Sequence, residues 1–120
     1  MKVAITASGS DLSAPLDPRF GRAAGFLVVD TETGETTYAP NDQNLNAPQG
    51  AGIQTAQNVA ATGAKAVISG HCGPKAFRIL NASNIAVYPC SAATADEALA
   101  LFKAGGLEAA NAADVEGHWI

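Results

Sequence analysis

Residues 69–74, with the sequence SGHCGP, place His71 directly beside Cys72, and a glycine stands on each side of the pair. The two side chains could form a catalytic or a metal-binding site, because thiolate suits soft metals such as Cu(I) and imidazole also suits copper. The alternative is a tight turn from a strand into a helix that carries these side chains without using them. Since a single histidine is more often a capping or surface residue than a ligand, the local sequence leaves both interpretations open.

Composition narrows the classes of function. The chain has 120 residues, the usual size of one domain, and its net charge is −4. Its seven basic residues are spread thinly, which argues against the basic stripe that nucleic-acid binding needs. No apolar run approaches the roughly 20 residues of a membrane span, and no export signal is visible, so we expect a cytoplasmic protein. The two cysteines form neither a C-x-x-C motif nor a disulfide framework.

The elements that must position His71 and Cys72 follow from hydrophobic patterning. Short apolar or β-branched runs predict strands at residues 2–6, 25–31, 35–39, 65–70 and 85–89. Helical spacing predicts helices that begin near Ala51, at Pro74 and after Thr94, where a Thr94–Glu97 capping box stands. The order predicts an α/β fold of ribonuclease H-like topology. We expect a five-stranded mixed sheet in the order 3-2-1-4-5, with strand 2 antiparallel and helices on both faces.

In this topology the carboxyl ends of strands 1, 3, 4 and 5 share one edge, where open α/β sheets bind ligands. Residues 7–24, 40–52, 69–74 and 89–94 would meet there. Two helix N-termini, after Gly50 and after Gly73, would present unpaired N–H groups and positive dipole ends. Arg19 and Arg22 add positive charge, so the edge predicts an anion site.

Each of these features also has a simpler interpretation. Arg19 and Arg22 could form surface ion pairs with Asp17 and Asp11. Cys90 reads as a small buried apolar residue, although the topology could bring its thiol near that of Cys72. A nuclease is excluded, because residues 2–6 and 65–70 carry none of the carboxylates that two metal ions would need.

Three stretches together resemble the dinitrogenase iron-molybdenum cofactor biosynthesis family. They are LDPRFGRAAGFLVVDTETGE (16–35), GAGIQTAQ (50–57) and AVISGHCGPKAFRIL (66–80). The resemblance covers about residues 2–105, so we expect a single cluster-binding domain at 1–105 and a C-terminal tail at 106–120. It implies a ribonuclease H-like domain that binds and carries a metal–sulfur cofactor without catalysing a reaction. The stand-alone length is closer to the small molybdenum–copper sulfide proteins of sulfate reducers than to the nitrogenase proteins.

The edge and the resemblance together predict the residues of the site. The expected cofactor-binding residues are Arg19, Phe20, Arg22, Gly50, Gly52, Gly70, His71, Cys72, Gly73 and Pro74, with His71 and Cys72 as candidate metal ligands. The expected ligand is a molybdenum–copper sulfide cluster or a related molybdenum or iron–sulfur cluster, exchanged with other cytoplasmic proteins. We expect neither nucleic acid nor membrane as a partner. Two alternatives stay open: a small enzyme acting on a phosphorylated metabolite, and a protein-interaction module without a ligand.

Overall fold

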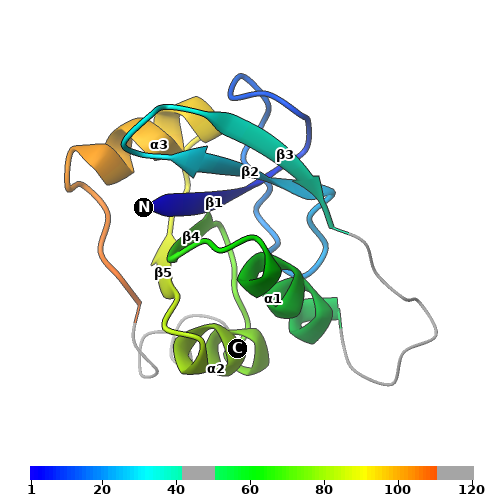
Figure 1. The fold of residues 1–120 in the computed structure, drawn as a ribbon. Helices are drawn as coiled ribbons and strands as arrows, with labels where there is room; N and C mark the ends of the chain where they lie inside the picture. Colours follow the sequence, from blue (N-terminus) through cyan, green and yellow to red (C-terminus); the bar gives the residue numbers. More distant parts are fainter. Residues whose placement is uncertain (42–50, 111–120) are drawn as a thin grey trace.

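The computed structural model describes residues 1–41 and 51–110 (Figure 1). Strands and helices follow in the order β-β-β-α-β-α-β-α, as the sequence predicts. The strands are β1 (Lys2–Ala7), β2 (Gly25–Asp30), β3 (Thr36–Pro40), β4 (Ala66–Ser69) and β5 (Ala86–Pro89). The helices are α1 (Ala51–Ala61), α2 (Pro74–Ala82) and α3 (Ala95–Lys103).

The five strands form one mixed sheet in the order β3-β2-β1-β4-β5, which confirms the predicted order. Strand β2 is antiparallel to both of its neighbours, β1 and β3. Strands β1, β4 and β5 are parallel to one another. The carboxyl ends of β1, β3, β4 and β5 therefore lie at one edge of the sheet, which we call the carboxyl edge.

Side-chain alternation along the strands divides the core between the two faces of the sheet. On β1, Ala4 packs with the buried residues of α1 and α2, whereas Val3 and Ile5 pack with those of α3. Figure 1 shows this arrangement, with α1 and α2 on one side of the sheet and α3 on the other. The prediction of helices on both faces is confirmed, and each face has its own apolar layer.

The turns and caps form where the sequence signals them. Gly34 and Gly63 adopt φ of +80° and +82°, values that favour glycine, in the β2–β3 turn and after α1. The Thr94 side chain accepts a hydrogen bond from the N–H of Glu97 at 3.2 Å. The Glu97 carboxylate accepts the N–H of Ala93 at 3.2 Å, one residue earlier than the usual capping box requires.

Packing continues a few residues past the predicted domain boundary at 105. Leu107 is half-buried against the layer under α3, and the Ala110 N–H donates a hydrogen bond to the Val87 oxygen on β5 at 2.7 Å. The boundary itself stays a prediction, and residues 111–120 of the predicted tail lie outside the described residues. Across residues 1–41 and 51–110, no helix is both long enough and apolar enough to span a bilayer.

The layer under α1 and α2 predicts a large difference between two leucines. Leu80 on α2 is 0% exposed, and Leu101 on α3 is 42% exposed. We expect Leu80→Ala to lower the free energy of unfolding by about 2–5 kcal/mol, because it removes buried apolar contacts and leaves a cavity. Leu101→Ala, the matched control, should change it by no more than about 0.5 kcal/mol. Urea unfolding curves measure both values, and equal losses would contradict the assigned core.

Candidate functional site

The chain between β1 and β2 is fastened to the carboxyl edge by backbone hydrogen bonds. Its Phe20 N–H donates to the His71 oxygen at 2.8 Å. Thr6, at the end of β1, holds Asp17 twice: the Asp17 N–H donates to the Thr6 oxygen, and the Thr6 hydroxyl donates to the Asp17 oxygen, both at 2.9 Å. Residues 17–20 therefore lie against the turn that carries His71.

Gly70 makes this close approach possible. A Cβ atom at residue 70 would lie 2.6 Å from Pro18 Cα and 2.7 Å from the Pro18 oxygen, closer than real Cβ contacts. Both neighbouring atoms belong to the backbone, so they cannot move aside as a flexible side chain could. At Gly73, by contrast, a Cβ atom would have no heavy atom within 4 Å.

Phe20 anchors residues 19–23, which carry the two arginines and which we call the arginine segment. Its ring is 1% exposed and packs against Phe26 with ring centroids 6.4 Å apart. Arg19 and Arg22 stand on either side of it and are exposed. The structure therefore places Phe20 as an anchor beneath the site, and the arginines on the surface.

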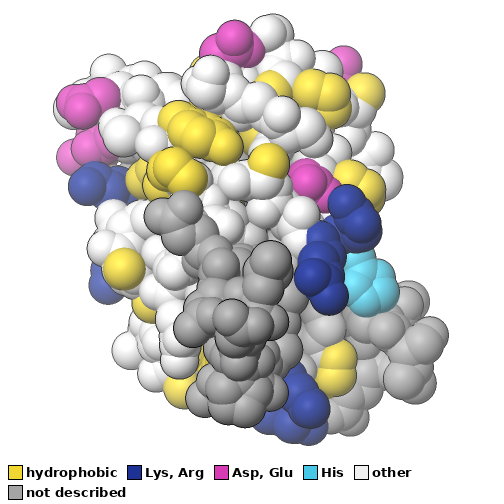
Figure 2. All heavy atoms as spheres, turned by 90° about the vertical axis from the view of Figure 1, so that its right-hand side faces the viewer, with side chains coloured by type: hydrophobic (Ala, Val, Ile, Leu, Met, Phe, Trp, Pro, Cys, Tyr) yellow, Lys and Arg dark blue, Asp and Glu magenta, His cyan; other side chains and the backbone are white. Residues whose placement is uncertain are grey.

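The arginines have no salt-bridge partner within residues 1–41 and 51–110. Among the described residues, no salt bridge joins Arg19 or Arg22 to a carboxylate, so the predicted alternative of surface ion pairs is not realised there. The Asp17 carboxylate instead accepts the backbone N–H of Arg19 at 3.0 Å. Asp17 is buried and offsets part of the positive charge. Figure 2 shows basic side chains gathered beside the histidine on the side of the molecule that is at the right in Figure 1.

Two helices begin at this edge with no acidic residue in their first turns. A Cβ atom on Gly52 of α1 would lie 3.4 Å from Ala76 Cβ of α2, so the first turns of the two helices pack together. The N-cap of α2, Gly73, supplies no side-chain acceptor, and the first turns of both helices hold no acidic residue that would compensate the positive end of the dipole. In α3, Asp96 and Glu97 compensate the same end. The predicted contribution of Gly50 lies outside the described residues.

Lys75, in the first turn of α2, adds a cation that the sequence-based site did not include. An exposed cation at a helix N-terminus is unfavourable by about 0.3–1 kcal/mol, so Lys75 does not stabilise α2. It strengthens the positive character of the edge. Its position directly after Pro74 was visible in the sequence, and only the packing of α2 shows which edge it faces.

A polar network ties the arginine segment to α1, and the sequence gives no signal for it. The Thr55 hydroxyl donates to the Gly21 oxygen at 3.1 Å. The Asn41 side-chain amide donates to Thr55 Oγ1 at 3.0 Å and to the Ala23 oxygen at 2.9 Å. Asn58 donates to Asn41 Oδ1 at 2.8 Å. These residues fix the arginine segment from the side of α1, as Thr6 does from β1.

The two thiols lie on opposite faces of the sheet, contrary to the expectation that they could be near each other. Cys72 packs with the layer under α1 and α2, and Cys90 packs with the layer under α3. Cys72 is 1% exposed, and burial raises the pKa of its thiol to about 12. Its sulfur lies 3.8 Å from the Gly73 oxygen, to which the thiol donates. As a candidate metal ligand, Cys72 is a protonated thiol turned into the core.

Cys90 shares a cavity with His71. The cavity has a volume of about 430 Å³ and is lined by Leu16, Pro18, Gly70, His71, Cys90, Ser91 and Ala92. The structure thus brings together Gly70, His71 and the arginine segment, as predicted. Cys90 is buried, as the sequence suggested, and it also lines this cavity. Among the described residues, no three His, Cys, Asp or Glu side chains group closely enough to hold a metal ion.

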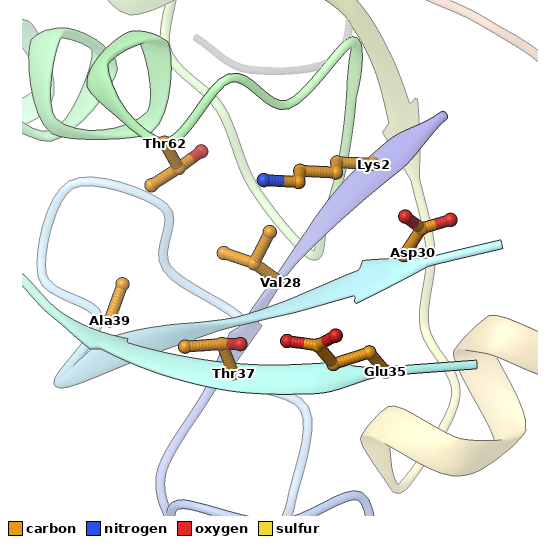
Figure 3. Close-up of a pocket in the computed structure, with 7 residues that line it drawn as sticks. All are labelled: Lys2, Val28, Asp30, Glu35, Thr37, Ala39 and Thr62. Atoms are coloured by element: carbon orange, nitrogen blue, oxygen red, sulfur yellow. The ribbon is translucent and has the colours of Figure 1, made fainter. Parts of the chain in front are cut away.

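A second cavity, of about 460 Å³, lies over the α1 face of β1, β2 and β3 (Figure 3). Lys2, Asp30 and Glu35 line it toward the edge opposite the carboxyl edge, and Val28, Thr37 and Ala39 line the rest of it along the strands. This cavity mixes one cation with two carboxylates and contains none of the predicted site residues. Charge and residue identity therefore favour the carboxyl edge as the anion site.

Known proteins are similar to this chain over most of its length. The sequence profile described as dinitrogenase iron-molybdenum cofactor matches residues 1–105. The apo form of the orange protein from Desulfovibrio gigas is 41% identical, with a TM-score of 0.85, over 91% of this chain and 92% of that one. A putative NifB protein from Thermotoga is 32% identical, with a TM-score of 0.75, over 90% and 91%. An uncharacterised protein of Methanocaldococcus jannaschii is 34% identical over 110 residues, 90% of each chain.

The contact at Gly70 predicts unequal effects of two glycine substitutions. Gly70→Ala should lower the free energy of unfolding by about 1–3 kcal/mol, because the added methyl group forces the Pro18 backbone away. Gly73→Ala, the matched control, should stay within about 1 kcal/mol, since the space around residue 73 is open. Urea unfolding measures stability, and the amide chemical shift of Phe20 reports the bond to His71. An unshifted Phe20 amide in Gly70→Ala would contradict the close approach.

The placement of the thiols predicts an order of alkylation. Both cysteines are buried, but Cys90, 7% exposed, lines an open cavity, whereas Cys72 is 1% exposed and stays protonated. At pH 8 the native protein should therefore react with iodoacetamide at Cys90 before Cys72. Mass spectrometry of peptides taken over time measures both rates. The difference should vanish in concentrated urea, and faster labelling of Cys72 in the native state would show that its thiol is not held in the core.

Proposed function

Because the chain belongs to the dinitrogenase iron-molybdenum cofactor family, we propose that it binds and carries an anionic metal–sulfur cluster at the carboxyl edge of its sheet. One observation carries the proposal. Two helix N-termini without acidic residues and two arginines outside any described salt bridge meet at one edge of a chain whose net charge is −4. Exposed arginines and helix N-termini gathered in this way suit an anionic ligand.

The donor set supports a cluster that brings its own sulfide. The described residues offer no group of three metal-ligating side chains, so they cannot build a cage of thiolates around bare metal ions. They do offer backbone N–H groups at the starts of α1 and α2 and the guanidinium groups of Arg19 and Arg22. Sulfide ligands of a preformed cluster can accept such hydrogen bonds, and the donors are already in place before binding.

In its finer form the proposal is a non-catalytic carrier for a molybdenum–copper sulfide or iron–molybdenum type cluster. The protein would receive the cluster from, or deliver it to, other cytoplasmic proteins, with neither nucleic acid nor membrane as a partner. Two free thiols support a reducing compartment. The order of the sheet supports the ribonuclease H-like assignment. Direct coordination by His71 and Cys72 stays a prediction, and the burial of Cys72 counts against its half of that pair.

Charge removal tests the proposed function. We expect the double variant Arg19→Ala, Arg22→Ala to bind a copper–tetrathiomolybdate mixture at least about 10-fold more weakly, since each nearby charge contributes on the order of 1 kcal/mol. The double variant Lys65→Ala, Lys103→Ala is the matched control: it removes the same charge from exposed positions, before β4 and at the end of α3. Anaerobic titration followed by visible absorbance measures loading.

Salt supplies a second readout of the same contacts. Loading of the wild type should weaken as salt rises, because ions screen the exposed arginines, and the Arg19, Arg22 variant should respond less. Equal loading of the two double variants would refute the charge-based site. A wild type that keeps no visible absorbance after the unbound mixture is removed by gel filtration, but binds inorganic phosphate, would favour the enzyme alternative instead.

A further inference from the structure

The cavity at the carboxyl edge contains two side chains that bind soft metals, and they come from neighbouring strands. His71 follows β4 and Cys90 follows β5. The Cys90 N–H donates to the Ser69 oxygen at 2.9 Å, which continues the β4–β5 pairing to the point where the two segments leave the sheet. His71 and Cys90 therefore stand on adjacent segments and line the same cavity of about 430 Å³.

The walls of this cavity are held by the backbone. The Leu16 N–H donates to the Ala93 oxygen at 3.1 Å, and a bridge pairs Pro15 with Thr94. On the other side of the cavity, the hydrogen bond from the Phe20 N–H to the His71 oxygen holds the β1–β2 segment against the turn after β4. The backbone of the segments that carry His71 and Cys90 is therefore fixed before a ligand enters the cavity, which lowers the ordering cost of binding.

The orientation of Cys90 suits metal binding better than that of Cys72. The Cys90 sulfur accepts a hydrogen bond from the Ala92 N–H at 3.4 Å, a contact that stabilises negative charge on sulfur. The Cys72 sulfur instead lies beside a carbonyl oxygen, at 3.8 Å, and that contact requires the thiol to keep its proton. Only Cys90 lines the cavity that contains His71.

We propose that His71 and Cys90 form a binding site for a soft monovalent metal ion, with Cu(I) as its representative. Cu(I) favours thiolate and accepts imidazole, and it can be held by as few as two ligands, which a cavity with one thiol and one imidazole provides. On binding, the Cys90 S–H bond breaks, a sulfur–copper bond forms, and the proton goes to solvent. A nitrogen of the His71 ring donates its lone pair to copper, and no electron is transferred.

This inference rests on the proposed function, because it uses the same edge, and it adds which side chains touch a soft metal of the cargo. With Cu(I) at the site, open coordination positions would face a cavity wide enough for sulfide from the cluster. The arginines and helix N-termini would hold the anionic remainder, so metal contact and charge contact come from different residues.

The test uses Cu(I) alone, without molybdenum or sulfide, in competition with the chromophoric chelator bicinchoninate under anaerobic conditions. We expect the wild type to take one Cu(I) per chain from the chelator. Removing a ligand should cost at least the roughly 10- to 100-fold in affinity that loss of an outer hydrogen-bond partner costs. Cys90→Ser and His71→Ala should therefore bind correspondingly more weakly. Cys72→Ser tests the rival ligand pair, His71 with Cys72: on this inference it should bind as the wild type does, and a loss equal to that of Cys90→Ser would overturn the inference.

A second measurement needs no variant and so does not depend on how a substituted chain folds. Cu(I) should protect Cys90 of the wild type from iodoacetamide and leave the slow labelling of Cys72 unchanged. Protection of Cys72 alone, or equal Cu(I) affinity in Cys90→Ser and the wild type, would overturn the inference. Cu(I) binding that depends on Cys90, in a protein that fails to load the thiomolybdate mixture, would support this site and refute the proposed cargo. Cluster loading without Cu(I) binding would do the reverse.

Discussion

The candidate site depends on one close backbone approach, that of Pro18 to Gly70. Only a residue without a Cβ atom leaves room there, since an added Cβ would lie 2.6 Å from Pro18 Cα. Because the chains approach this closely, the Phe20 N–H can reach the His71 oxygen at 2.8 Å. That bond links the arginine segment to the histidine turn and the N-terminus of α2. The sheet topology brings these segments to one edge, and this bond fixes the distance between them.

The anchors of the arginine segment are spread over several elements. Phe20 inserts its ring into the layer under α1 and α2, and Thr6 holds Asp17 from the end of β1. Thr55 and Asn41 hold the far end of the segment from α1 and from the residue after β3. Buried groups fix the backbone of this segment. The guanidinium groups of Arg19 and Arg22 can therefore stay at the surface without salt bridges to carboxylates among the described residues. A fixed backbone lowers the reorganisation that binding an anion at this segment would require.

The fold separates two potential metal-binding side chains that are adjacent in the sequence. His71 and Cys72 are adjacent in the chain, but the turn sends the Cys72 sulfur into the layer under α1 and α2 and leaves His71 exposed. Cys90 reaches the cavity from the other layer, eighteen residues later in the chain. The nearest pair in sequence is therefore not the pair that shares a cavity. Charge contacts and soft-metal contacts with a ligand come from different segments of the same edge.

The sequence by itself determined the elements, the order of the sheet and the edge at which the site lies. Those features follow from local signals: β-branched runs, Gly34 and Gly63 in turns, Pro74 at a helix start and the Thr94 cap. Only the tertiary structure decided which cysteine faces the cavity, that Phe20 is an anchor, and that Asn41 and Thr55 support the arginine segment. The physical reason is the range of the interactions. A strand or cap is set by residues a few positions apart, whereas the direction of a side chain after a strand end depends on contacts between segments distant in the chain.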